Sequence, residues 1–148
     1  MPLDASYAGH TYPPAPPYLV GREKIREYAA AVGETNPLYF EADAARSAGY
    51  ADVVAPPMFA VVYGARSVGR AIIDPDVGIN FAMMVHAGQE FVWGPLVVAG
   101  DEISTTASVK DISDRGGMAF YVFETVSQNQ RGETVCTGTW TQIVRGAS

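Results

Sequence analysis

Three side chains able to take part in acid–base chemistry lie within one short segment, Gly33-Glu-Thr-Asn-Pro-Leu-Tyr39. Glu34 offers a carboxylate, Asn36 an amide and Tyr39 a phenol. A group that shuttles protons near neutral pH works best with a pKa near 7, whereas an unperturbed tyrosine has a pKa of about 10. Tyr39 would therefore need strong activation to act as a base. Structural roles remain open: a place beside a helix end for Glu34, a turn for Asn36-Pro37, and packing for Tyr39.

The remaining candidate residues are isolated from one another. His10 lies in an irregular N-terminal stretch, where we expect it to be exposed, and His86 lies in or just before a strand. We interpret His86 as structural, with a displaced general base as the alternative, and Cys136 as a small packed hydrophobe. Two distant histidines and one cysteine give no zinc-ligand spacing. No nucleophile elbow or phosphate-binding loop is present, so the sequence indicates no metal and no cofactor.

Composition narrows the class of protein. The 148 residues carry a net charge of −6, with 48% hydrophobic and 18% charged residues. We expect a single domain over residues 1–148, with an irregular, proline-rich segment at 1–17. The acidic balance argues against nucleic-acid binding, and no run of about 18 apolar residues predicts a membrane span. A lone cysteine suits a reducing compartment, which favours the cytoplasm.

The elements that must position these residues follow from periodicity. Residues 22–32 predict a helix with Ile25, Tyr28, Ala29 and Val32 on its apolar face, ended by Gly33. A short helix is expected at 41–48. The longest helical pattern, 58–73, is apolar nearly all round until Arg66 and Arg70, which is typical of a helix in the middle of a domain.

The second half of the chain predicts an antiparallel sheet. The expected strands are 87–92, 101–112, 118–128 and 134–144, with hairpin turns at 114–117 and 129–132 and an edge strand near 18–20. A sheet that must bury one face, together with an apolar helix, indicates an α+β protein whose sheet wraps around the central helix: the hotdog arrangement. Exposed sheet edges then favour a dimer.

Four segments resemble one enzyme family. Gly33 to Tyr39 resembles the Gly-Asp-x-Asn-Pro-hydrophobic-His motif of MaoC-like, (R)-specific enoyl hydratases and dehydratases. Ala55-Pro-Pro-Met-Phe59 lies where that family begins its central helix, and Pro95-Leu-Val-Val-Ala-Gly-Asp101 resembles the stretch that leads into its strands. Val20-Gly-Arg-Glu-Lys-Ile-Arg-Glu-Tyr28 is similar to substrate-binding subunits of the heterodimeric (3R)-hydroxyacyl-ACP dehydratase of fatty-acid synthesis. The resemblance extends over about residues 12–144.

The departures from that family bear directly on catalysis. In the active enzymes the Asp and His of the motif form the catalytic pair, and here Glu34 and Tyr39 take those positions beside a retained Asn36. The family's His-Gly at the helix start, whose amide helps to bind the thioester carbonyl, is also missing. Pro56 and Pro57 lack the N–H groups that such an oxyanion site needs. The resemblance therefore implies a non-catalytic subunit.

We expect a subunit of a (3R)-hydroxyacyl-thioester dehydratase or enoyl hydratase, bound to acyl-CoA or acyl-ACP, with a partner hotdog subunit that supplies the catalytic His. The candidate tunnel residues on the central helix are Pro57, Met58, Phe59, Val62 and Tyr63, with plain core packing as the alternative. Two other functions stay open: a self-sufficient homodimeric hydratase that uses Glu34 with Tyr39 or His86, and a non-enzymatic module that binds acyl thioesters.

Two groups of cations complete the set of candidates: Arg22, Lys24 and Arg26 near the start of the first helix, and Arg66 and Arg70 near the end of the central helix. Cations near a helix C-terminus are stabilised by the helix dipole, which is a sufficient structural reason for the second group. The functional hypothesis is that some of them contact an acidic carrier protein or the phosphates of the substrate's pantetheine arm.

Overall fold

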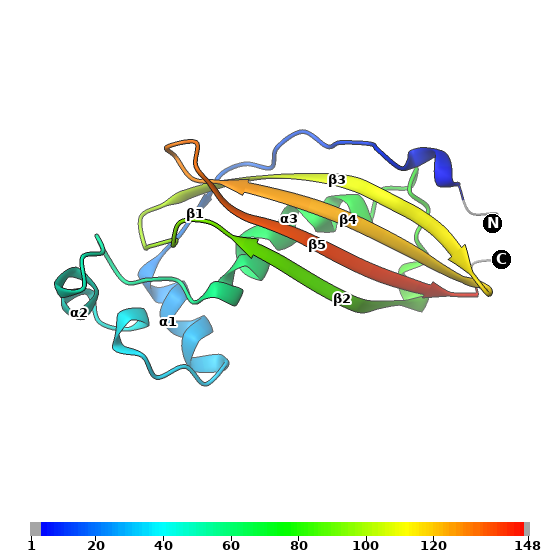
Figure 1. The fold of residues 1–148 in the computed structure, drawn as a ribbon. Helices are drawn as coiled ribbons and strands as arrows, with labels where there is room; N and C mark the ends of the chain where they lie inside the picture. The colour runs from blue at the N-terminus through cyan, green and yellow to red at the C-terminus, as the bar shows by residue number, and fades with distance from the viewer. Residues whose placement is uncertain (1–3, 147–148) are drawn as a thin grey trace.

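A five-stranded antiparallel sheet forms the larger part of the fold in the computed structural model, which describes residues 4–146 (Figure 1). Its strands lie in the order β1-β3-β4-β5-β2. Their bounds are β1 Tyr18–Leu19, β2 Met84–Trp93, β3 Glu102–Arg115, β4 Met118–Gln128 and β5 Thr134–Arg145. The four long strands predicted from the sequence are confirmed, with β2 beginning three residues before its predicted start.

Alternation of side chains explains why one face of this sheet is buried. Along β4 the buried residues alternate with half-buried ones from end to end, and β5 nearly repeats the pattern. The turn between β3 and β4 is closed by Gly116 and Gly117, both at positive φ (65° and 84°), as a two-residue hairpin loop requires. The predicted hairpins at 114–117 and 129–132 are thus confirmed.

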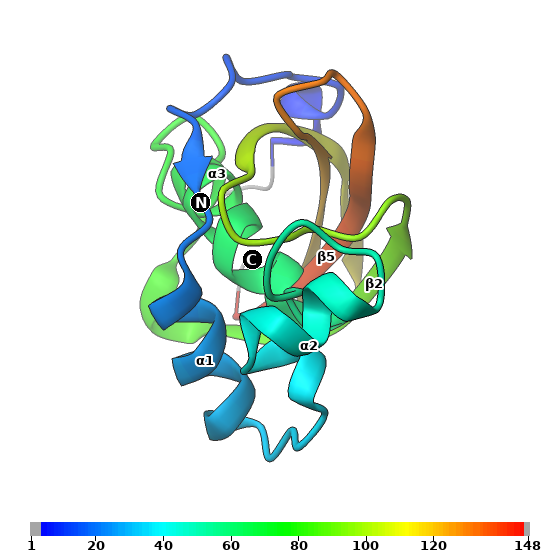
Figure 2. The ribbon, with the colours of Figure 1, turned by 90° about the vertical axis from the view of Figure 1, so that its left-hand side faces the viewer.

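The central helix, α3 Ala60–Ile72, packs against the concave face of the sheet (Figures 1 and 2). A single turn of 3-10 helix, η3 Pro57–Phe59, precedes it. Gly64 allows close contact with the sheet, because a Cβ there would lie 3.1 Å from the ring of Trp140. The predicted arrangement of a sheet wrapped around a helix is confirmed.

The predicted helix over 58–73 differs from α3 in two respects. The helix proper begins at Ala60, because the two prolines before it favour a 3-10 turn, and it is not buried all round. Ala65 and Arg66 are exposed, since the sheet covers only part of the helix circumference. At the end of the pattern Ile73 is 72% exposed, which a fully enclosed helix would not allow.

Two short helices, α1 Arg22–Ala31 and α2 Ala42–Ser47, lie together beyond one end of the sheet (Figures 1 and 2). Ile25 and Ala29 bury the apolar face of α1, whereas Val32, predicted to share that face, is exposed just after the helix ends. Two further 3-10 turns, η2 Pro37–Tyr39 and η4 Phe81–Met83, precede α2 and β2 respectively.

The N-terminal segment runs along β3 as an irregular strap after one 3-10 turn, η1 Ala5–Tyr7. The amides of Gly9, Tyr12 and Ala15 donate to carbonyls of β3. The sequence predicted an irregular stretch at 1–17. Its first three residues lie outside the described part of the chain, and the rest is irregular apart from η1 and a bridge at Thr11.

Candidate functional site: a motif loop beside an apolar pocket

The motif loop, residues 33–40, is built as a helix exit followed by a capped turn. Gly33 takes a positive φ of 79° and ends α1, and the Glu34 amide donates back to the carbonyl of Ala29. The side chain of Asn36 then accepts a hydrogen bond from the Leu38 amide at 3.0 Å, with Pro37 at the first position of η2. Asn36 and Pro37 therefore shape the turn, and the Asn36 side chain is exposed.

Glu34 and Tyr39 lie close enough to interact electrostatically. Both are half-buried, and no hydrogen bond joins their side chains among residues 4–146. Burial raises the pKa of Tyr39 above its ordinary value, and the nearby Glu34 carboxylate raises that pKa further. Both causes favour the protonated phenol. Tyr39 thus keeps its proton at neutral pH, the reverse of what a general base needs.

The start of the central helix offers little to an oxyanion. Pro56 and Pro57 have no N–H, and the Phe59 amide already donates to the Pro56 carbonyl at 2.8 Å. This leaves the Met58 amide as the one N–H of the turn without a backbone acceptor among the described residues. An oxyanion hole assembled from several converging donors is therefore not formed by this turn.

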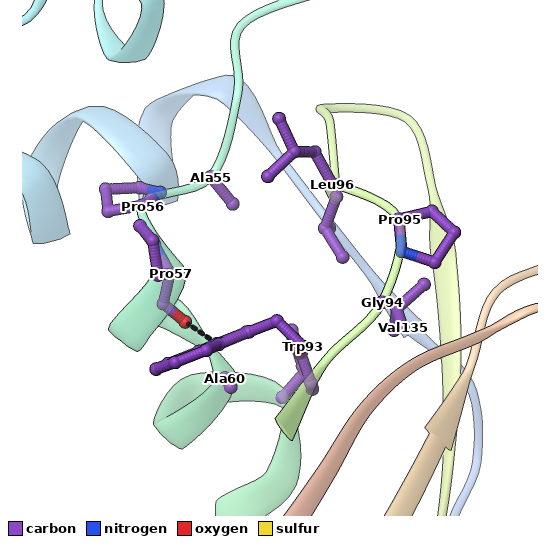
Figure 3. Close-up of a pocket in the computed structure, with 11 residues that line it drawn as sticks. Ala55, Pro56, Pro57, Ala60, Trp93, Gly94, Pro95, Leu96 and Val135 are labelled. Carbon is purple, nitrogen blue, oxygen red and sulfur yellow. Dashed lines mark hydrogen bonds between the residues drawn. The ribbon is translucent and has the colours of Figure 1, made fainter. Parts of the chain in front are cut away.

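An apolar cavity of about 290 Å³ lies beside the helix start (Figure 3). One side comes from residues 55–57 and 60 and the other from the pocket wall, residues 93–97. Tyr63 of α3 and Val135 of β5 complete the lining. No acidic or basic side chain lines it within residues 4–146. An apolar pocket of this kind suits an alkyl chain.

The candidate tunnel residues have different surroundings. Pro57 and Tyr63 line the cavity, and Val62 and Tyr63 line a smaller cavity of about 50 Å³ under the N-terminal strap. Phe59 is 0% exposed and packs edge-on against Tyr18, Tyr28 and Tyr63. Met58 is 44% exposed and lines neither cavity. Glu34, Asn36 and Tyr39 do not line these cavities either.

Residues 53–55 connect the motif loop to the pocket. The Val54 amide donates to the Leu38 carbonyl at 2.9 Å, and the Ala55 amide donates to the Val97 carbonyl at 2.8 Å. The turn after the pocket wall is fixed by Asp101, which is buried and accepts hydrogen bonds from the Val98 amide and the Gln130 side chain. The two regions are thus adjacent and share one backbone support.

Sequence reasoning missed the part of the site contributed by the sheet edge. Trp93, the last residue of β2, donates from Nε1 to the Pro57 carbonyl at 2.9 Å and so reaches across to the helix start (Figure 3). Leu96 and Val97 also line the cavity. Their segment resembles a family motif, but that resemblance predicted only where the strands begin, not a pocket. The sequence did offer one indication of this part of the site: Trp93 directly precedes Gly94-Pro95, a pair that indicates a bend at a strand end.

The other candidates lie apart from the pocket. His86 is in β2, exposed, with Nδ1 2.9 Å from the side-chain amide of Gln142, and His10 is exposed and stacks on Tyr7. Cys136 is buried in β5. Within the described chain, no group of three or more His, Cys, Asp or Glu residues could hold a metal ion.

The candidate cations are mostly engaged with nearby groups. Arg22 forms a two-pronged pair with Asp52 at 2.8 Å, Lys24 and Arg26 pair with glutamates of α1, and Arg70 donates to the Pro13 carbonyl. Arg66 is exposed on α3. None of the described helices is long and apolar enough to cross a membrane.

Comparison with known proteins agrees with this architecture. The family model of the FAS1-like dehydratase domain region matches residues 5–138. A UPF0336 protein of Leifsonia xyli subsp. xyli is 42% identical, over 99% of this chain and 98% of its own length. A MaoC-like dehydratase structure superposes with a TM-score of 0.85 at 32% identity, covering 96% of this chain and 43% of that one.

A second structure matches almost end to end. The C-terminally truncated HadBC (3R-hydroxyacyl-ACP dehydratase) complex from Mycobacterium tuberculosis superposes with a TM-score of 0.80 at 29% identity, covering 93% of this chain and 96% of that one. The extent of the family match and the identity over nearly the whole chain agree with the wrapped sheet and helix. This chain therefore belongs to the FAS1-like dehydratase family and has the hotdog fold of the MaoC-like dehydratases.

Proposed function

We propose that this chain, acting as one domain over residues 1–148, is the substrate-binding subunit of a (3R)-hydroxyacyl-thioester dehydratase or enoyl hydratase. It holds the acyl chain, and a partner hotdog subunit supplies the catalytic His. One observation carries the proposal: the apolar cavity at the helix start is formed, while the adjacent motif loop has a half-buried Tyr39 at the position where a base is needed. Binding is supported by this geometry and proton transfer is not.

The cavity accounts for affinity toward an acyl chain. Transfer of alkyl groups from water into an apolar site contributes roughly 0.8 kcal/mol per methylene. Trp93, which lines the pocket, is 49% exposed, so part of the lining lies at the molecular surface and is accessible to an entering chain. This arrangement supports the acyl part of an acyl-CoA or acyl-ACP as the ligand.

The edge strand β2 is the proposed surface for the partner. Its outer edge pairs with no strand among the described residues, and Val85 and Val92 are each about half exposed or more. An unpaired strand with exposed apolar side chains is a template for pairing with a second sheet. The HadBC structure is a complex, and the MaoC-like dehydratase chain is long enough to hold a second domain of this size. Both support a hotdog partner.

Positive charge on the central helix is the proposed contact for an acidic carrier protein. Arg66 is exposed, and Arg70 contacts only a backbone carbonyl among the described polar groups. If the substrate arrives on an acidic carrier protein, reversal of both charges to Glu should weaken binding of that carrier, because it removes two attractive charges and adds two repulsive ones. Unchanged carrier binding would remove Arg66 and Arg70 from the proposal. The lone cysteine favours the cytoplasm for this reaction.

The test is hydration of crotonyl-CoA and longer enoyl-CoA substrates, followed at the absorbance of the conjugated thioester. The purified chain alone should give no turnover, and turnover should begin when a hotdog protein with the intact Gly-Asp-x-Asn-Pro-x-His motif is added. Turnover by the chain alone, lost in Glu34→Gln or Tyr39→Phe, would establish a self-sufficient homodimer instead. Inactivity in both conditions would leave a non-enzymatic acyl-thioester-binding module.

A further inference from the structure

The two walls of the apolar pocket are joined to each other in two different ways. On one side the Ala55 amide donates to the Val97 carbonyl, and both residues are buried. On the other side, the Trp93 Nε1 donates to the Pro57 carbonyl, and among residues 4–146 no other hydrogen bond joins the pocket wall to the turn 57–59. Trp93 is 49% exposed, so this second link can open without disturbing the core. The Trp93 ring, joined to Pro57, therefore forms the more exposed side of the pocket (Figure 3).

The side chains of the lining offer no partner for a carboxylate. Pro56, Pro57 and Pro95 contribute no N–H, and the Trp93 N–H is already used by Pro57. Tyr63 is the remaining polar side chain of the lining, and its hydroxyl lies near the Cys136 thiol. A carboxylate placed in such a site would lose hydration without gaining a charged or hydrogen-bonding side chain in exchange, which is unfavourable.

The size of the cavity sets a limit on chain length. A volume of about 290 Å³ is available. One small group such as a water occupies about 30 Å³ in a liquid, so roughly ten non-hydrogen atoms fill the space. Each added methylene should therefore increase affinity by about four-fold until the space is filled, and little afterwards.

We propose that Trp93 is the specificity-determining residue of this pocket: its ring, pinned to Pro57, restricts the ligand to an uncharged alkyl tail of limited length. The inference rests on the proposed function only in taking the ligand to be an acyl thioester. It adds that the alkyl tail is the end of the ligand that enters, that this tail carries no charge, and that Trp93 limits its length.

Saturated acyl-CoAs from butanoyl to dodecanoyl test the proposal, with affinity for the full chain measured by calorimetry. For the unaltered protein, affinity should rise with length and level off near roughly ten carbons. In Trp93→Ala, octanoyl-CoA should bind about ten-fold more weakly because an aromatic contact is lost, and the plateau should move to longer chains. Trp93→Phe keeps an aromatic ring without the N–H and is therefore the variant less prone to misfold. It should still bind short chains, but its affinity should no longer level off sharply with chain length.

Two controls sharpen the result. Ile73→Ala, exposed at the far end of α3, should leave the length profile unchanged. Octanoyl-CoA with a carboxylate at its tail end should bind at least about 100-fold more weakly than octanoyl-CoA. The proposal is overturned by an identical profile in the Trp93 variants, by equal binding of the charged tail, or by no binding of any length. Because saturated chains cannot be hydrated, failure of the hydration assay is a separate outcome.

Discussion

The motif loop and the pocket wall lie on either side of residues 53–55, and they differ in what their side chains do. In the motif loop, the Asn36 side chain caps a turn by accepting from the Leu38 amide. Glu34 and Tyr39 lie half-buried, with no hydrogen bond between their side chains among the described residues. In the pocket wall, apolar side chains frame a defined cavity, and the side-chain N–H of Trp93 joins that wall to Pro57 at the helix start. This difference supports the proposal that the chain binds the acyl group and leaves acid–base chemistry to a partner.

The largest expected effect is on the free energy of unfolding, and it distinguishes Phe59 from its neighbour Met58 at the helix start. Phe59→Ala should lower the free energy of unfolding by about 3–5 kcal/mol, because the ring is fully buried among Tyr18, Tyr28 and Tyr63. Met58→Ala should cost less than about 1 kcal/mol, since that side chain is 44% exposed. Urea denaturation measures both. Equal losses would mean that the two residues share one environment.

The second effect concerns the corner of the pocket wall. A Cβ at Gly94 would collide with the backbone carbonyl oxygen of Thr134, and backbone cannot move aside as a side chain can. Gly94→Ala should therefore destabilise the protein by about 1–3 kcal/mol and weaken acyl-CoA binding. Gly69→Ala is the matched control, because a Cβ there meets nothing within 4 Å. Normal acyl-CoA affinity in Gly94→Ala would show that this corner does not define the cavity.

A smaller effect is expected on the motif-loop side, at the ion pair that ties α1 to residues 52–53. Hydrogen bonding to Arg22 lowers the pKa of Asp52 below its ordinary value of 3.8. The pair's contribution is therefore complete above that ordinary value and is lost as pH falls through the lowered pKa of the folded state. Asp52→Asn should flatten this acid limb of the stability curve, with a loss of no more than about 1 kcal/mol at pH 7 because Arg22 is exposed.

Stability measured between pH 6 and pH 2 checks this prediction. Arg22→Gln should flatten part of the same limb, and Asp52→Asn should flatten what remains, because the Val53 amide and Arg46 also stabilise the Asp52 carboxylate. A curve for Asp52→Asn that runs parallel to that of the unaltered protein would show that another carboxylate is responsible.

The sequence predicted the strands well because β4 and β5 are rich in the β-branched and aromatic residues that favour strands, and Gly-containing turns bound them. It overestimated the burial of the central helix, since apolar small residues such as Ala65 do not reveal which side the sheet leaves open. Gly33 as a helix end and Asn36-Pro37 as a turn were also predictable, from local geometry.

The pocket was only partly predictable. Pro57 and Tyr63 were among the candidates, but helical spacing could not distinguish a side chain that lines a cavity from one, such as Phe59, that fills the core. Trp93 was missed because its contact with Pro57 joins residues 36 positions apart, across the gap between a sheet edge and a helix start. Such a contact depends on the curvature of the sheet.

The central claim is that this chain binds the acyl group and leaves proton transfer to its partner. The most direct test is the turnover number of the reconstituted pair on crotonyl-CoA, with Glu34→Gln and Tyr39→Phe combined in this chain. We predict turnover within about two-fold of the unaltered pair, because neither side chain carries the reaction. A loss of about 100-fold or more, the size expected when a general acid or base is removed, would contradict the claim.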